Sequence, residues 1–150
     1  MGALSNNLEN ELIDHIFRGR SFTAPTTIWI ALHTGDPGET GANNEVSVTD
    51  TGYARAQLNP SYSNWEGTGG EVTDVDSAGT GAHTQNNAQI NFPTPTGGTN
   101  WGTISHFSAW SLQSGGVCYI YGTITPNKSV NQGDPAPYFA VGDLDFTLDT

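Results

Sequence analysis

The histidines and serines are the residues of this chain whose chemistry could support nucleophilic catalysis. The four histidines are His15, His33, His83 and His106. Nucleophilic catalysis needs a nucleophile, a neighbouring base and a group that orients the base. The sequence has no Gly-x-Ser-x-Gly elbow, and Asp14 and His15, although adjacent, do not face each other on a helix. We therefore expect no catalytic residues, with His15 exposed on a helix and His33 and His106 as strand-end or half-buried structural rings.

Acidic residues give two weak indications of a metal site. Residues 74–79 begin like a calcium-binding loop, but Ala78 stands at the fifth position and Gln85 at the twelfth, where such a loop needs ligands. Asp143 and Asp145 lie two residues apart on one expected strand face, where solvated outward carboxylates are much commoner than metal ligands. The Cys/His spacing of a zinc site is absent from the sequence. We expect neither a metal nor another cofactor.

Paired carboxylates could also cleave polysaccharide, which requires two carboxyl groups at a set separation in an aromatic-lined cleft. The acids of this chain fall mostly in expected turns or at outward strand positions. A chain of 150 residues also leaves little room for such a cleft. A non-enzymatic protein is therefore the expectation, and a small glycan-degrading enzyme is the alternative from another functional class.

Charge and composition exclude two further classes of partner. The formal net charge is −11, with only four lysine and arginine residues. Nucleic-acid binding needs basic groups that neutralise phosphates, and an anionic membrane surface would repel this chain. We expect no nucleic acid and no membrane as partners, whereas a basic protein surface would attract the chain. The single cysteine, Cys118, precludes an intrachain disulfide and is expected to be a small buried apolar residue.

The first element expected to position side chains is a helix over residues 6–18. Its apolar residues recur at spacings of one, three and four and form one face: Leu8, Leu12, Ile13, Ile16 and Phe17. Ser5 or Asn6 can cap its start, and Gly19 can take the left-handed position at its end. Such a face must pack on its own sheet or on a neighbouring subunit. Leu8, Leu12 and Ile16 are therefore candidate partner-contact residues.

Residues 22–150 have the alternating pattern of strands. Residues 26–33 are apolar on both faces, which predicts a central buried strand. Further strands are expected at 53–58, 88–92, 99–112, 117–124, 128–132 and 138–148, with a hairpin turn at 113–116. The sequence thus predicts a mainly β single domain over 1–150, with one N-terminal helix and an antiparallel β-sandwich or barrel-like arrangement with long loops.

Residues 59–87 form the least regular segment, which is rich in glycine and poor in apolar residues. A structureless loop of this length is unusual inside a compact domain. The segment is therefore either an excursion used for contacts or a partly ordered hairpin around residues 71–75. Its aromatic pair, Tyr62 and Trp65, gives two more candidate partner-contact residues, although the same pair could simply pin the loop to the domain.

Several motifs, each weak alone, occur in a specific order along almost the whole chain. They are Leu-Glu-Asn-Glu-Leu-Ile-Asp-His-Ile-Phe-Arg-Gly at 8–19, Ile-Ala-Leu-His-Thr-Gly-Asp-Pro at 30–37, Glu-Val at 45–46, Gly-Tyr-Ala-Arg at 52–55, Ile-Asn-Phe-Pro at 90–93, Trp-Gly-Thr-Ile at 101–104, His-Phe at 106–107 and Gly-Asp-Leu at 142–144. This set resembles a family of small tailed-bacteriophage and prophage proteins that are often labelled tail-fibre-like. The resemblance implies a structural virion protein at the particle surface, made in the host cytoplasm, and it brings no catalytic residues.

The shortness of the chain decides between the roles that this resemblance leaves open. Long fibres are usually built from long repetitive chains, whereas this sequence shows no repeat and reads as complete from its own Met1. We therefore expect a capsid cement or decoration protein that binds and stabilises the shell, with the major capsid protein as partner and a homo-oligomeric state. A tail-fibre-associated or receptor-binding module is the alternative.

Overall fold

The computed structural model describes residues 2–148, and strands dominate this part of the chain. The elements are β1 (Gly2–Leu4), α1 (Asn6–Phe17), β2 (Trp29–His33), β3 (Ala56–Gln57), β4 (His83–Gln85), β5 (Ile90–Asn91), β6 (Gly102–Trp110), β7 (Cys118–Val130), β8 (Tyr138–Phe139) and β9 (Asp145–Thr147). Every strand pair is antiparallel. The predicted mainly β fold with one N-terminal helix is confirmed.

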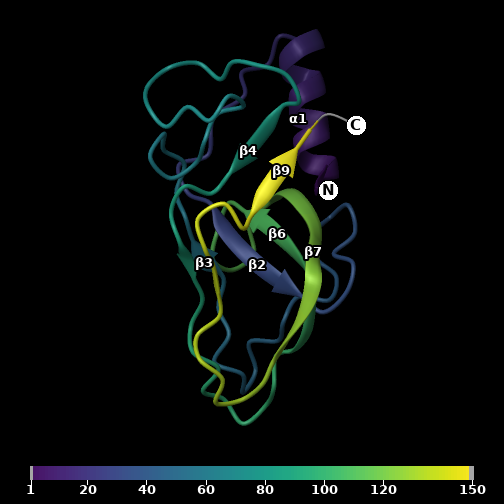
Figure 1. Cartoon of the computed structure of the whole chain (residues 1–150). Coiled ribbons are helices and arrows are strands. Elements are labelled where there is room, and N and C mark those ends of the chain that lie inside the picture. Colours follow the sequence, from purple (N-terminus) through teal and green to yellow (C-terminus); the bar gives the residue numbers. More distant parts are fainter. Residues whose placement is uncertain (1, 149–150) are drawn as a thin grey trace.

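The main sheet has five strands in the order β1-β7-β6-β2-β3 (Figure 1). Strand β2 lies inside it, paired with β6 on one side and β3 on the other, as its two apolar faces predicted. The predicted hairpin between β6 and β7 is also present. The prediction of two short strands at 117–124 and 128–132 is wrong, because β7 is continuous. Residues 124–127 of β7 bulge opposite Ser105 of β6, and pairing resumes at Lys128 and continues to Val130.

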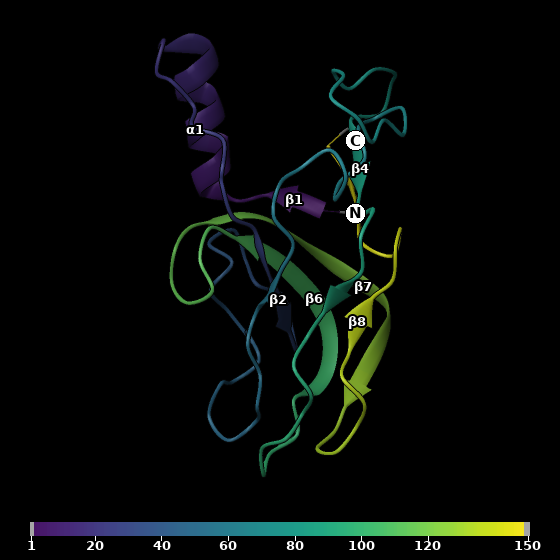
Figure 2. The same ribbon diagram turned by 90° about the vertical axis from the view of Figure 1, so that its left-hand side faces the viewer.

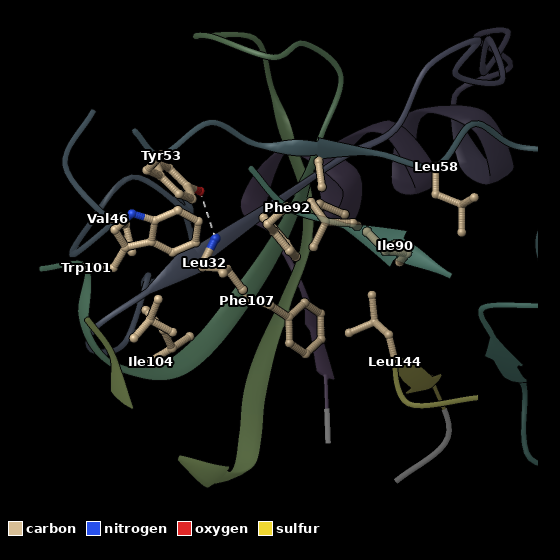
Figure 3. Packing of buried hydrophobic residues seen from close by; sticks show 14 of the residues in the cluster. Leu32, Val46, Tyr53, Leu58, Ile90, Phe92, Trp101, Ile104, Phe107 and Leu144 are labelled. Carbon is tan, nitrogen blue, oxygen red and sulfur yellow. Dashed lines mark hydrogen bonds between the residues drawn. The ribbon is translucent and has the colours of Figure 1, made fainter. Parts of the chain in front are cut away.

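One face of the main sheet packs on two small sheets, β4-β9 and β5-β8. Leu32 of β2 and Phe107 of β6 meet the side chains that the small sheets contribute (Figure 3). Ile30 of β2 belongs to the same cluster. The small sheets and their flanks supply Ile90, Phe92, Leu144 and Phe146, all nearly fully buried. The Phe107 and Phe146 rings lie 5.2 Å apart in an edge-to-face arrangement, which ties β6 to β9. This layer is the main core.

The opposite face of the main sheet is covered by the chain itself. Ala31, Trp110 and Cys118 form a second buried cluster there. Gly41, in the loop after β2, lies directly on it, since an added Cβ would come within 2.5 Å of the Cys118 sulfur. The prediction that Cys118 is a small buried apolar residue is confirmed, as it is 3% exposed.

The helix α1 stands apart from both layers (Figure 2). It follows β1, an edge strand that the sequence analysis missed and that pairs with β7. The Ser5 hydroxyl caps the helix by accepting from the Leu8 backbone N–H, and Gly19 takes the left-handed conformation, as predicted. No residue of α1 is buried. The helix therefore does not pack its apolar face on its own sheet.

The irregular segment 59–87 is partly ordered, although not as a hairpin at 71–75. It ends in β4, and Trp65 forms an isolated bridge with Asn86 that returns the loop to the domain. The predicted single strand at 138–148 is two short strands, β8 and β9, each paired with a different segment. Asn86 holds the turn between them, because its side chain donates to the Ala140 carbonyl and accepts from the Leu144 amide.

Replacing Phe107 by alanine should lower the free energy of unfolding by about 3–5 kcal/mol, because it removes a buried ring and leaves a cavity between the two layers. Val141→Ala is the matched control, since Val141 is 56% exposed and its truncation should change stability by less than about 0.5 kcal/mol. Urea unfolding followed by tryptophan fluorescence measures both. Equal stability of the two variants would contradict the core described above.

Candidate binding surfaces

The helix α1 presents an apolar surface to solvent. Ile13, Ile16 and Phe17 are 52%, 65% and 79% exposed, whereas Leu8 and Leu12 are half-buried. Large apolar side chains that are exposed next to one another on one element are typical of an interaction surface. We call Ile13, Ile16 and Phe17 the helix face. Of the predicted contact residues, Ile16 belongs to it and Leu8 and Leu12 lie beside it.

The body of the protein holds this helix by its first turn. The Ser5 hydroxyl donates to the Cys118 carbonyl at 2.5 Å, and the Ser5 amide donates to the Tyr119 carbonyl at 2.9 Å. The Asn6 amide donates to the Glu39 carbonyl at 3.1 Å. These bonds fix the helix to β7 and to the loop after β2. The later turns are free of comparable contacts with the sheet, and this leaves the helix face available.

The end of the helix carries positive charge. Arg18 and Arg20 each lie 3.1 Å from Asp14, so that two guanidinium groups share one carboxylate. Both arginine side chains are 69% exposed. One positive charge is therefore left uncompensated beside the helix face. This places half of the four basic residues of the chain at one helix end.

A pocket of about 410 Å³ lies between the main sheet and the 59–87 segment. Its apolar lining combines side chains from the sheet, the segment and β9: Ile28, Tyr62, Trp65, Val75, Ile120 and Phe146. Tyr62 is 55% exposed, whereas Trp65 is half-buried and packs on Phe146 at 6.3 Å between ring centroids. The structure thus brings the two predicted aromatic contact residues into one pocket, with Trp65 also pinning the loop.

Three carboxylates, those of Glu66, Glu71 and Asp76, also line this pocket. Glu66 accepts from the Gln85 amide at 2.9 Å. Backbone hydrogen bonds, first from its own amide and then from Gly69 and Ala78, hold the pKa of Glu71 below its usual value. Two of the three acids therefore order the loop, and all three give the pocket a negative rim.

A buried polar chain joins β2 to β6. The His33 ring donates from Nδ1 to the Asn43 carbonyl at 2.8 Å, so Nε2 accepts from the Ser108 hydroxyl at 2.6 Å. The Trp110 indole N–H donates to the same hydroxyl at 2.6 Å. His33 and Ser108 have the separation of a nucleophile and its base, but both are 0% exposed. Their hydrogen bond ties β2 to β6 in the interior, and His33 is more deeply buried than predicted.

Arg55 has a structural role that the sequence pattern did not predict, and it is only 7% exposed. Its guanidinium makes two hydrogen bonds to the Glu45 carboxylate, at 2.8 and 2.7 Å, and two to the carbonyls of Leu112 and Gly115. It also stacks over Trp110 at 4.0 Å from the ring centroid. A buried cation needs such partners. The sequence feature that could have indicated a buried Arg55 is its position inside the expected strand 53–58, between two alanines.

Cys118 and Tyr53 are two further ionisable residues in the interior of the protein. Burial raises the pKa of the Cys118 thiol to about 12, which makes the thiol unreactive. Burial also raises the pKa of Tyr53, whose hydroxyl donates to Glu45 and accepts from the Leu32 amide. Within residues 2–148, no group of three or more His, Cys, Asp or Glu side chains is placed to hold a metal ion. No helix in this range is long and apolar enough to cross a membrane.

The predicted contact residues fall on two separate surfaces. Sequence periodicity identified the apolar helix residues, but it did not show that Ile13 and Phe17 are the exposed ones together with Ile16. The pocket floor from Ile28 and Ile120 was missed, because these residues are brought together by strand pairing across long sequence separations. A pattern among neighbouring residues cannot predict that these two side chains line one pocket.

The body is β-rich and antiparallel, with a projecting helix that has an apolar face and with a surface pocket. Comparison with known proteins identifies the class as tail-fibre-like structural proteins of phage virions. The chain belongs to the family described as Gp80, Podophage GP4 fiber I protein gp80, whose model matches residues 3–147. A search of the curated proteins gives no match. The resemblance to tailed-phage structural proteins noted in the sequence is confirmed.

The burial of His33 predicts a pH dependence of stability. Desolvation by burial holds the pKa of His33 below its usual value, so the unfolded chain takes up a proton near pH 6.5 that the folded chain does not bind. This contribution to stability is complete above that pH. It should decline by up to about 1.4 kcal/mol per pH unit as the pH falls below it.

Urea unfolding at several pH values between 7.5 and 5.5 measures this slope. The variant His33→Gln should lose the slope, whereas His15→Gln, at an exposed helix position, should keep it. An unchanged slope in His33→Gln would show that His33 is not the responsible group.

Proposed function

We propose that this protein is a non-catalytic subunit of the phage tail-fibre apparatus, located at the particle surface, which assembles with copies of itself and with another virion protein. The match of the fibre-protein family over residues 3–147 is the observation that carries the proposal. The helix face supports it, because three large apolar side chains exposed on one helix favour burial against a partner.

Capsid decoration, which the shortness of the chain predicted, is the second candidate. A small subunit anchored through one helix could equally bridge neighbouring shell proteins, and a net charge of −11 suits docking on a basic surface. In this role the partner would be the major capsid protein. The two candidates use the same contact surfaces and differ in the place and number of copies.

The proposal of a non-enzymatic role rests on how the reactive groups are used. The Ser108 hydroxyl is closed off in the core, where it already accepts from Trp110. Glu66 and Glu71, the acids nearest to the aromatic pocket residues in sequence, are both engaged in hydrogen bonds that order the loop. A glycosidase needs one carboxyl as acid and another as nucleophile or base. These two carboxylates are instead used as structural acceptors.

Copy number and location on the particle test the fibre proposal. Purified virions of the phage that encodes this chain would be labelled with an antibody fragment and imaged by electron microscopy, with the copy number read from a stained gel against the major capsid protein. If the protein belongs to the tail-fibre apparatus, each virion should contain few copies of it, and the antibody label should lie at the tail. Label spread over the shell, with copies comparable to the capsid protein, would contradict it in favour of decoration.

A direct assay tests the absence of glycan cleavage. The purified chain should release no reducing sugar from the surface polysaccharide of the host. Turnover that disappears in Glu66→Gln or Asp76→Asn, while circular dichroism shows an intact fold, would show instead that the pocket acids are catalytic. Asp134→Asn, which changes an acid outside the pocket lining, is the matched control.

A further inference from the structure

We propose that the helix face of one copy inserts into the aromatic pocket of a second copy of this chain, so that the protein assembles head to tail. The inserted residues are Ile16 and Phe17, and the receiving residues are Tyr62, Val75 and Ile120. This deepens the proposed role as an assembling subunit by naming the two surfaces that meet. It is tested on the purified chain, so its failure would leave the placement in the virion untouched.

Apolar complementarity is the first support. Phe17 and Ile16 are the two most exposed residues of the helix face, at 79% and 65%. The pocket offers about 410 Å³, and its lining includes the apolar side chains of Ile28, Trp65 and Ile120. Anchor side chains that fill a desolvated pocket dominate the energy of protein interfaces. The chain thus carries both an apolar anchor and a receptor of suitable size.

Charge complementarity selects which end of the helix enters. Arg18 and Arg20 follow the helix face directly and share the single carboxylate of Asp14, which leaves one uncompensated positive charge. The pocket is lined by the carboxylates of Glu66, Glu71 and Asp76. A chain with a net charge of −11 repels its own copies over most of its surface. This contact is a place where the two surfaces attract each other.

The placement of the two surfaces favours a second copy as the occupant. Figures 1 and 2 show α1 and the loop before β4 at the same end of the molecule, and Figure 2 shows them on opposite sides of that end. Ile16 and Phe17 remain exposed in the single chain, so this chain does not fill its own pocket. Copies related by rotation can therefore exchange the contact side by side. Such a contact uses two different surfaces and closes into a ring when the rotation allows.

Self-association of the full chain tests the proposal. Sedimentation velocity over a concentration series should show association of the wild type. The helix variant Ile16→Ser/Phe17→Ser and the pocket variant Tyr62→Ala/Val75→Ser should each raise the dissociation constant about tenfold or more, since each removes anchor contacts. All four positions are at least half exposed, so both variants should fold, and circular dichroism checks this. Tyr138→Ala, at a tyrosine 57% exposed outside this pocket, should associate like the wild type.

Mixing the two variants distinguishes this contact from other modes of pairing. An equimolar mixture of helix variant and pocket variant retains one intact combination and should form a heterodimer. Arg20→Gln should weaken association, whereas Lys128→Gln, which removes the same charge elsewhere, should not.

Three results would overturn the proposal. They are a wild type that stays monomeric at every concentration, a pocket variant that associates like the wild type, or a mixture without heterodimer. The second result would leave the pocket to another occupant, such as a glycan, and would point to pairing of the helix faces with each other.

Discussion

The burial of β2 on both of its faces is the constraint on which the rest of this structure depends. One face packs against the two small sheets, and the loop after β2 covers the other. A strand buried on both sides requires partners for every polar group near it. The chain provides these through the chain of hydrogen bonds from Trp110 to Asn43 and through the Arg55–Glu45 ion pair. These bonds tie the loop after β2 to the main sheet.

This arrangement explains the position of the helix. Segments of the same chain cover most of both faces of the sheet, and no residue of α1 is buried against them. It is fixed instead through Ser5 to β7, and its later turns project into solvent. The covering is also incomplete at one end of the sheet, where Ile28 and Ile120 floor the pocket under the 59–87 segment. The structure therefore leaves both an unpaired helix face and an unfilled apolar pocket.

Local sequence patterns predicted the features that depend on neighbouring residues. The helix, its cap at Ser5, its end at Gly19, the central strand and the β6–β7 hairpin all follow from such patterns. Strand β1 was not predicted, since three residues have no detectable period and form a strand only because β7 offers an edge. The continuity of β7 and the floor of the pocket were missed for the same reason, as both depend on pairing between distant segments.

Hydrogen–deuterium exchange of the purified chain tests most directly whether the helix is left free by its own domain. In dilute solution, the amides of the later turns of α1 should exchange much faster than those of β2 and β6, because Ile13, Ile16 and Phe17 are exposed and no residue of α1 is buried. At concentrations where copies associate, protection should rise in these turns and in the segment around Tyr62. Slow exchange of α1 in the dilute chain, equal to that of β2, would contradict the account.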